Sequence, residues 1–179
     1  YRNVIDECVR LNNAGEYSPL AVETSGHCAF KDNYFLDDGA YLVTEILIIL
    51  AGQLKKGQRL ADLISGLEEP AEAAEIRPEI TCEDFREYGA EVLKELEKLA
   101  VNCEGATIAP ENYEGIRINF DKDHGDGWLL IRMSLHEAIL PINVESNSAG
   151  GCKKMVSAIL QLLRGFRYVD LSLLEKFVA

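Results

Sequence analysis

Three short segments of alternating apolar and polar residues in the second half of the chain constrain its fold more than any other feature. In the first, Ile116, Ile118 and Phe120 alternate with polar residues, which is the pattern of a strand with one buried face. The Asp- and Gly-rich stretch 121–127 predicts a tight hairpin into the second segment. The predicted strands are 115–120, 127–133 and 141–145. We therefore expect an antiparallel sheet.

Helical patterns flank these strands on both sides. Apolar residues recur at helical spacing over 85–99, after a segment at 81–84 that resembles a capping box. An edge strand is expected at 74–80, because an edge position tolerates Pro78. A last helical region begins after Gly150-Gly151 and continues to the end of the sequence, with a break near Gly165. This order predicts a small α+β domain with a mostly antiparallel sheet and helices on one face.

The first half of the chain has a different pattern, in which helices predominate. Its predicted elements are a helix at 4–13, a strand at 20–23, a helix at 40–50 and a short helix at 60–67. The helix at 40–50 is apolar on most of its sides, so we expect it to be buried. The acidic, Ala-rich stretch 68–75 is the most linker-like part of the sequence. We place a domain boundary there, between 1–69 and 70–179.

Charge, cysteines and apolar runs exclude several classes of protein. The 179 residues carry a net charge of −12, which repels a nucleic-acid backbone. The five cysteines are odd in number and form no C-x-x-C pair, so we expect reduced thiols rather than a zinc site or disulfides. The longest wholly apolar run, Ile46–Ala51, is far shorter than the roughly 18–20 residues that cross a bilayer. We expect a cytoplasmic protein with no nucleic-acid or membrane partner.

The first candidate binding segment is Glu23–His27, at the end of the strand predicted at 20–23. Neighbouring sugar hydroxyls both donate and accept hydrogen bonds, so a carboxylate beside hydroxyl side chains suits their recognition. Gly26 lets the backbone approach a ligand closely, and His27 offers a group that exchanges protons near neutral pH. By itself the segment fits an ordinary polar turn equally well.

The second candidate segment is 132–137, between two predicted strands. Arg132 offers a planar fork to phosphate oxygens, Ser134 adds a hydroxyl donor, and turn amides can form an anion nest. An arginine at the end of a strand can also be simply solvated.

Both segments resemble loops of the α-D-phosphohexomutase family, which includes phosphomannomutases, phosphoglucomutases and phosphoglucosamine mutases. The sequence Val-Glu-Thr-Ser-Gly-His at 22–27 is similar to the G-E-x-S-G-H sugar-specificity loop of that family. The Phe-Lys at 30–31 and the Asp-Asp-Gly at 37–39, which opens a predicted helix, are similar to the sequence downstream of that loop. The agreement of loop, spacing and helix start favours the sugar-binding interpretation.

The second segment resembles the R-x-S-G-T-E-P phosphate-binding loop of the last mutase domain. Arg132, Ser134 and Glu137 match the family pattern residue by residue. The departures are Leu135, His136 and Ala138, together with Ile139 and Pro141 at positions that often hold basic residues. The resemblance thus implies a phosphate grip that is less cationic than usual.

The resemblance implies that the chain is the end of the third domain, as a partial α/β domain, followed by the whole fourth domain, a small α+β domain, of a four-domain mutase. The start at Tyr1, in what reads as helix, fits an excerpt of a larger fold. In such a mutase a phosphoserine of the first domain exchanges a phosphoryl group with the sugar, assisted by Mg²⁺ on aspartates of the second domain. Neither of those loops occurs in the 179 residues. We expect no turnover and no metal ligand in this piece, and the N-terminal mutase domains as its partners.

The implied parent reaction is the interconversion of hexose 1-phosphate and hexose 6-phosphate, with the preferred hexose left open. The residues expected to grip the substrate are Glu23, Ser25 and His27 for the ring, and Arg132, Ser134 and His136 for the phosphate that is not transferred. His27 is also the candidate for proton transfer. Two alternatives remain, a non-catalytic sugar-phosphate-binding module and a vestigial site.

Other candidates for a site are weaker. Asp121, Asp123 and Asp126 hint at a calcium loop, but glycine and glutamate are missing at the positions that such a loop requires. We expect a plain hairpin turn with a solvated His124. The Gly-Gly pair at 150–151 precedes a helix and could bind an anion, but we expect only a turn into the helix.

Overall fold

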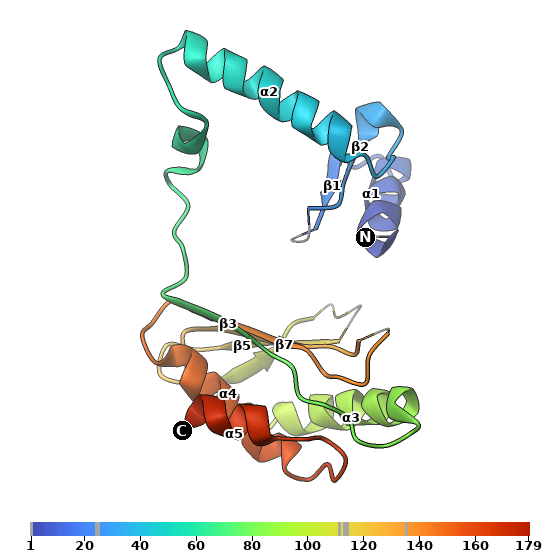
Figure 1. The fold of residues 1–179 in the computed structure, drawn as a ribbon, viewed down its shortest axis with the longest axis vertical. Helices are drawn as coiled ribbons and strands as arrows, with labels where there is room; N and C mark the ends of the chain where they lie inside the picture. Colours follow the sequence, from blue (N-terminus) through green and yellow to red (C-terminus); the bar gives the residue numbers. More distant parts are fainter. Residues whose placement is uncertain (1, 24–25, 111, 113–114, 135) are drawn as a thin grey trace. The chain divides into compact units, whose positions relative to one another are not determined.

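The computed structural model describes residues 2–23, 26–110, 112, 115–134 and 136–179. The chain forms two compact units, Tyr1–Leu67 and Glu68–Ala179, which we call unit 1 and unit 2 (Figure 1). No helix among the described residues combines the length and the apolarity that crossing a membrane requires.

Unit 1 contains the helices and the strand that the sequence predicts, and one further short strand. Its elements are α1 (Arg2–Asn13), β1 (Leu20–Val22), β2 (Cys28–Phe30), the 3-10 helix η1 (Lys31–Asn33), α2 (Gly39–Lys55) and the 3-10 helix η2 (Leu60–Ile64). The chain leaves α1 through Gly15, whose φ of 85° favours glycine. The strands β1 and β2 form an antiparallel hairpin. The predicted short helix at 60–67 is thus a five-residue 3-10 helix.

The expectation that the helix at 40–50 is buried is wrong. This helix, α2, begins where Asp38 accepts hydrogen bonds from the backbone N–H groups of Ala40 (3.0 Å) and Tyr41 (3.1 Å). None of its described residues is buried, and Val43 and Leu47 are 55% and 57% exposed. Within unit 1 the main contacts of α2 are β2 and η2, which are too small to cover it.

The core of unit 1 is correspondingly small. Its buried cluster contains Cys8, Ala21 and Ala29, with Ile5 and Phe35 packed against it. Three small side chains supply little of the apolar burial that stabilises a fold.

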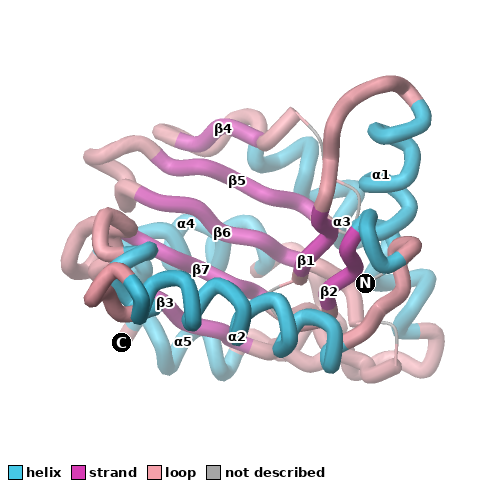
Figure 2. The backbone as a smooth tube through the Cα atoms, turned by 90° about the horizontal axis from the view of Figure 1, so that it is seen from above, coloured by secondary structure: helices cyan, strands magenta, loops and turns pink. Residues whose placement is uncertain are grey.

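Unit 2 is the α+β domain that the sequence predicts. Its elements are β3 (Glu72–Ile76), α3 (Phe85–Ala100), β4 (Ala106–Ile108), β5 (Ile116–Phe120), β6 (Gly127–Ile131), β7 (Ile142–Ser146), α4 (Gly151–Leu163) and α5 (Ser172–Val178). The strand order is β3-β7-β6-β5-β4 and every pairing is antiparallel (Figure 2). The predicted edge strand is β3, which begins earlier than 74–80 and ends before Pro78.

The helices α3 and α4 cover one face of this sheet, and α5 packs against α4 (Figure 1). The inward-facing strand residues Ile118, Leu129 and Val144 are fully buried, as are Leu96 of α3 and Ile159 of α4. Alternation along the strands and helical spacing on α3 therefore converge on one continuous core, as the sequence indicates.

The predicted capping box at 81–84 does not form, although the helix that follows it does. The hydroxyl of Thr81 lies 3.3 Å from the carbonyl oxygen of Tyr168 and donates to it. Asp84 occupies the cap position of α3 without a side-chain hydrogen bond. The Thr81 hydroxyl is thus bonded to a segment far away in the sequence and does not cap α3.

The turn at 121–127 is a hairpin turn, as expected, and its His124 is partly exposed (35%) but also has a carboxylate partner. The Oδ1 atom of Asp121 accepts hydrogen bonds from the backbone N–H groups of Asp123 (3.1 Å) and His124 (3.0 Å), and lies 2.6 Å from Nδ1 of His124. This side-chain hydrogen bond raises the pKa of His124 and lowers that of Asp121. The His124 ring lies over Gly105, where a Cβ atom would overlap it.

The Gly-Gly pair is a turn into a helix, as expected, and its amides are already satisfied. Gly150 has a φ of 77°. The carboxylate of Glu72 in β3 accepts hydrogen bonds from the N–H groups of Gly150 (2.6 Å) and Cys152 (3.2 Å). Burial, together with this carboxylate, raises the pKa of the Cys152 thiol to about 11. All five cysteines are unpaired, in agreement with the expectation of free thiols.

Candidate functional site

The sugar-binding segment predicted at 23–27 is the turn of the β1–β2 hairpin. The N–H of Glu23 donates to the carbonyl oxygen of His27 (3.0 Å), and the N–H of Gly26 donates to that of Glu23 (3.0 Å). Gly26 has a φ of 93°, in the region that favours glycine. Glu23 and His27 therefore lie at the two ends of one tight turn, while the third residue of the predicted set, Ser25, lies outside the described residues.

The carboxylate of Asp37, which the sequence indicated only as part of a helix start, contacts this turn. Oδ2 of Asp37 lies 2.7 Å from Nδ1 of His27, and Oδ1 accepts a hydrogen bond from the backbone N–H of Cys28 (3.3 Å). The available signal was the doubled acid before the helix, because one carboxylate is enough to cap α2. Asp38 performs that capping, and its hydrogen bonds, first from the N–H of Tyr41, lower its pKa.

The predicted phosphate-binding segment is the loop between β6 and β7. The hydroxyl oxygen of Ser134 accepts hydrogen bonds from the backbone N–H groups of His136 (3.4 Å) and Glu137 (3.2 Å). These are turn amides of the kind expected to form an anion nest, and the structure pairs them with Ser134 instead. The Ser134 hydroxyl keeps its own proton to donate.

Both flanks of this loop are anchored in the core of unit 2. The side chain of Met133 packs against Gly89, where a Cβ atom would overlap its sulfur. Leu140 is fully buried, and its N–H donates to the carbonyl oxygen of Pro78 (2.9 Å). The N–H of Ile80 donates to the carbonyl oxygen of Ala138 (2.7 Å). The exposed tip at 136–137 thus sits on a fixed base.

Arg132 lies at the start of this loop, and its backbone and its side chain differ in their contacts. Its N–H donates to the carbonyl oxygen of Pro141 (3.1 Å), which fixes its backbone. Its guanidinium makes no hydrogen bond or ion pair with any residue that the structure describes, whereas Arg59 and Arg77 are both paired with carboxylates. A guanidinium without a partner among the described residues can bind an oxyanion such as phosphate.

The described residues do not fit a Mg²⁺ site. They contain no group of three or more histidine, cysteine or acidic side chains that could hold a metal ion. In the turn that hinted at calcium, Asp121 accepts three hydrogen bonds, and Asp126 accepts one from the hydroxyl of Ser148 (2.7 Å).

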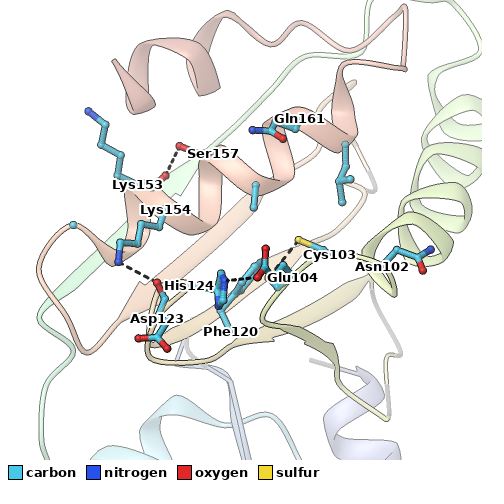
Figure 3. A pocket seen from close by; sticks show the side chains of 13 residues that line it. Asn102, Cys103, Glu104, Phe120, Asp123, His124, Lys153, Lys154, Ser157 and Gln161 are labelled. Carbon is cyan, nitrogen blue, oxygen red and sulfur yellow. Dashed lines mark hydrogen bonds and ion pairs between the residues drawn. The ribbon is translucent and has the colours of Figure 1, made fainter.

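A cavity of about 730 Å³ in unit 2 lies apart from the β6–β7 loop (Figure 3). It is formed by the end of α3, the 121–127 turn and α4, with Phe120 and Leu162 among its apolar residues. The ammonium of Lys154 donates to the carbonyl oxygen of Asp123 across its rim (3.1 Å). None of the described residues that were predicted to bind the sugar or the phosphate lines this cavity, so we do not assign the substrate to it.

The comparisons with known proteins bear on the fold. No protein-family model matches the sequence, and no curated protein matches it either. The fold is similar to the crystal structure of a phosphoglucomutase/phosphomannomutase family protein from Burkholderia thailandensis, with a TM-score of 0.66 and 23% sequence identity. The similarity covers 90% of this chain but only 31% of that one. The resemblance inferred from the two loops is thus confirmed at the level of the fold.

Proposed function

We propose that this chain is the C-terminal part of a phosphohexomutase that interconverts hexose 1-phosphate and hexose 6-phosphate. Its two loops would bind the sugar hydroxyls and the phosphate that is not transferred. The guanidinium of Arg132, which has no hydrogen bond or ion pair with the described residues and starts a loop whose flanks contact the core, supports this proposal most directly. The fold shared with part of a phosphoglucomutase/phosphomannomutase family protein supports it.

In this proposal residues 1–69 are the end of the third mutase domain and residues 70–179 are the fourth. The exposed apolar surface of α2 supports the assignment, because a helix of this composition needs a partner surface, which the remainder of a third domain would provide. The N-terminal mutase domains would be the partners of this chain, and they would carry the phosphoserine and Mg²⁺. We place the enzyme in the cytoplasm.

The residues of this chain would act by binding and orientation. Glu23 and Ser25 would accept and donate hydrogen bonds to ring hydroxyls, and His27 would orient the ring or exchange a proton with it. Arg132 would hold the distal phosphate, helped by Ser134 and His136. Such remote contacts place the reacting oxygen in line with the phosphoserine, and contacts of this kind contribute several kcal/mol to a transfer reaction.

The test is steady-state kinetics of the complete enzyme with Arg132→Ala. We expect kcat/KM for hexose 1-phosphate to fall tenfold or more, which corresponds to about 1.4 kcal/mol of lost transition-state binding. The matched control is Arg59→Ala, which removes an 83% exposed arginine from an ion pair with Asp62 and should leave kcat/KM unchanged. An unchanged kcat/KM for Arg132→Ala would remove this residue from the site.

A non-catalytic sugar-phosphate-binding module is the second candidate. The loop favours it in one respect, because Ile139 and Pro141 stand where basic residues are common, and their backbones serve pairing with neighbouring segments. Calorimetric titration of the complete protein with glucose 1-phosphate and mannose 1-phosphate, beside a turnover assay, separates the two candidates. Binding without turnover would favour the module.

A further inference from the structure

We propose that Asp37 is a positioning residue that fixes the tautomer and the direction of His27. In this arrangement Nδ1 carries its proton toward Asp37, and Nε2 is the nitrogen that gives or takes a proton. The tautomer follows from the geometry of unit 1 alone, whereas its use in turnover rests on the function proposed above.

The 2.7 Å distance between Nδ1 of His27 and Oδ2 of Asp37 carries the assignment. An ionised carboxylate only accepts hydrogen bonds, so the imidazole nitrogen that faces it must carry the proton. In the neutral ring the other nitrogen then has the lone pair. The His27 side chain is 50% exposed and that of Asp37 28%, so the ring is accessible to a ligand while its partner is more enclosed.

Backbone pairing holds the Asp37 carboxylate in place. Ala29 of β2 and Asp37 form an isolated antiparallel bridge. The N–H of Cys28 donates to Oδ1 of Asp37 (3.3 Å), and the N–H of Asp38 donates to the carbonyl oxygen of Cys28 (3.2 Å). The carboxylate is therefore held beside β2, the strand that follows the turn, and the ring of His27 points toward it.

The adjacent residues Asp37 and Asp38 have different partners. Asp38 caps α2, so loss of its carboxylate would act on the helix. Asp37 bonds His27 and one backbone amide, so loss of its carboxylate would act mainly on the ring. Burial, and then the charge of Asp37, raise the pKa of the Cys28 thiol, so this thiol stays protonated and does not compete as a base.

Long-range proton–nitrogen NMR correlation of the ring nitrogens tests the assignment in the full 179-residue chain. The spectra are recorded about two pH units above the ordinary histidine pKa of about 6.5, where a free neutral ring favours the proton on Nε2. We expect His27 to show the opposite tautomer, with the proton on Nδ1. Asp37→Ala should return it to the Nε2-protonated form, whereas Asp32→Ala, which removes a neighbouring acid, should not.

The chain supplies its own references, because it has only three histidines. His124 has the same Nδ1-to-carboxylate arrangement with Asp121. The signal of its neutral ring therefore marks the position expected for a proton on Nδ1. A wild-type His27 with its proton on Nε2, or an Asp37→Ala variant with an unchanged tautomer, would overturn the proposal. The wild-type spectrum alone decides the first point if the variant fails to fold.

The consequence for turnover has a separate readout. In the complete enzyme, Asp37→Ala should lower kcat about tenfold or more with little change in KM, because general acid–base catalysis typically contributes factors of at least a hundred. A confirmed tautomer with unchanged kcat would remove His27 from proton transfer while leaving the geometry intact. If wild-type His27 carried its proton on Nε2 while the complete enzyme was active and lost activity with Arg132→Ala, the present inference would be overturned but the proposed function would stand.

Discussion

The two units of this chain differ in how far they can account for their own folding. Unit 2 buries one continuous cluster of apolar side chains contributed by all its large elements, from Ile76 in β3 to Leu174 in α5. Among the described residues of unit 1, the buried cluster contains only three small side chains, Cys8, Ala21 and Ala29, although its helix α2 is strongly apolar. Apolar composition therefore does not by itself make a core, because burial also needs a complementary surface.

The largest effect should come from separating the units. We expect residues 68–179 to unfold cooperatively by themselves, with the fluorescence of Trp128, the only tryptophan, reporting the transition. Residues 1–67 should show no cooperative thermal transition by circular dichroism, because so few of their side chains are buried. A sharp transition in 1–67, or none in 68–179, would reverse the comparison.

A matched pair of leucine substitutions sharpens the same contrast. Leu129→Ala removes a fully buried side chain of β6 and should lower the free energy of unfolding by about 2–5 kcal/mol. Leu47→Ala removes a 57% exposed side chain of α2 and should change it by no more than about 0.5 kcal/mol. Urea unfolding followed by both fluorescence and circular dichroism measures the two values. Equal losses would mean that α2 has a packing partner in this chain.

The smallest effect concerns the pH dependence of unit 2. The bond to Asp121 raises the pKa of His124 above 6.5 and lowers that of Asp121 below 3.8. The stabilisation from His124 is fully present below pH 6.5 and is lost as the pH rises through its folded pKa, while that from Asp121 is lost as the pH falls through its own.

The variant His124→Gln should therefore lower the thermal midpoint most in mildly acidic solution, and the difference from wild type should shrink in alkaline solution. His136→Gln serves as the control, because the exposed side chain of His136 has no such partner among the described residues. A difference for His124→Gln that grows with pH would contradict the assigned pair.

Sequence patterns predicted the elements whose periodicity is long enough to be visible. The strands β5, β6 and β7 have five residues each and were predicted, whereas of the three-residue strands β1 was predicted and β2 and β4 were not. The burial of α2 was wrongly expected because an apolar helix says nothing about which surface covers it.

Contacts between distant residues were the other limit. Thr81 bonds a carbonyl 87 residues away, and Glu72 caps a helix that begins near Gly150, 78 residues away. Local sequence cannot reveal such partners. The same reason hid Asp37, whose bond to His27 depends on a bridge to β2 that only the folded hairpin provides.

The β6–β7 loop of this chain is proposed to bind phosphate by itself, and NMR titration of the labelled chain tests this proposal most directly. Glucose 1-phosphate should shift the amide signals of Arg132, His136 and Glu137 saturably, with a Kd of about 1 mM or below. Glucose without the phosphate should leave these signals in place, and Arg132→Ala should abolish the response. Loop signals that do not shift with glucose 1-phosphate, or that shift equally with glucose, would contradict phosphate binding by this loop.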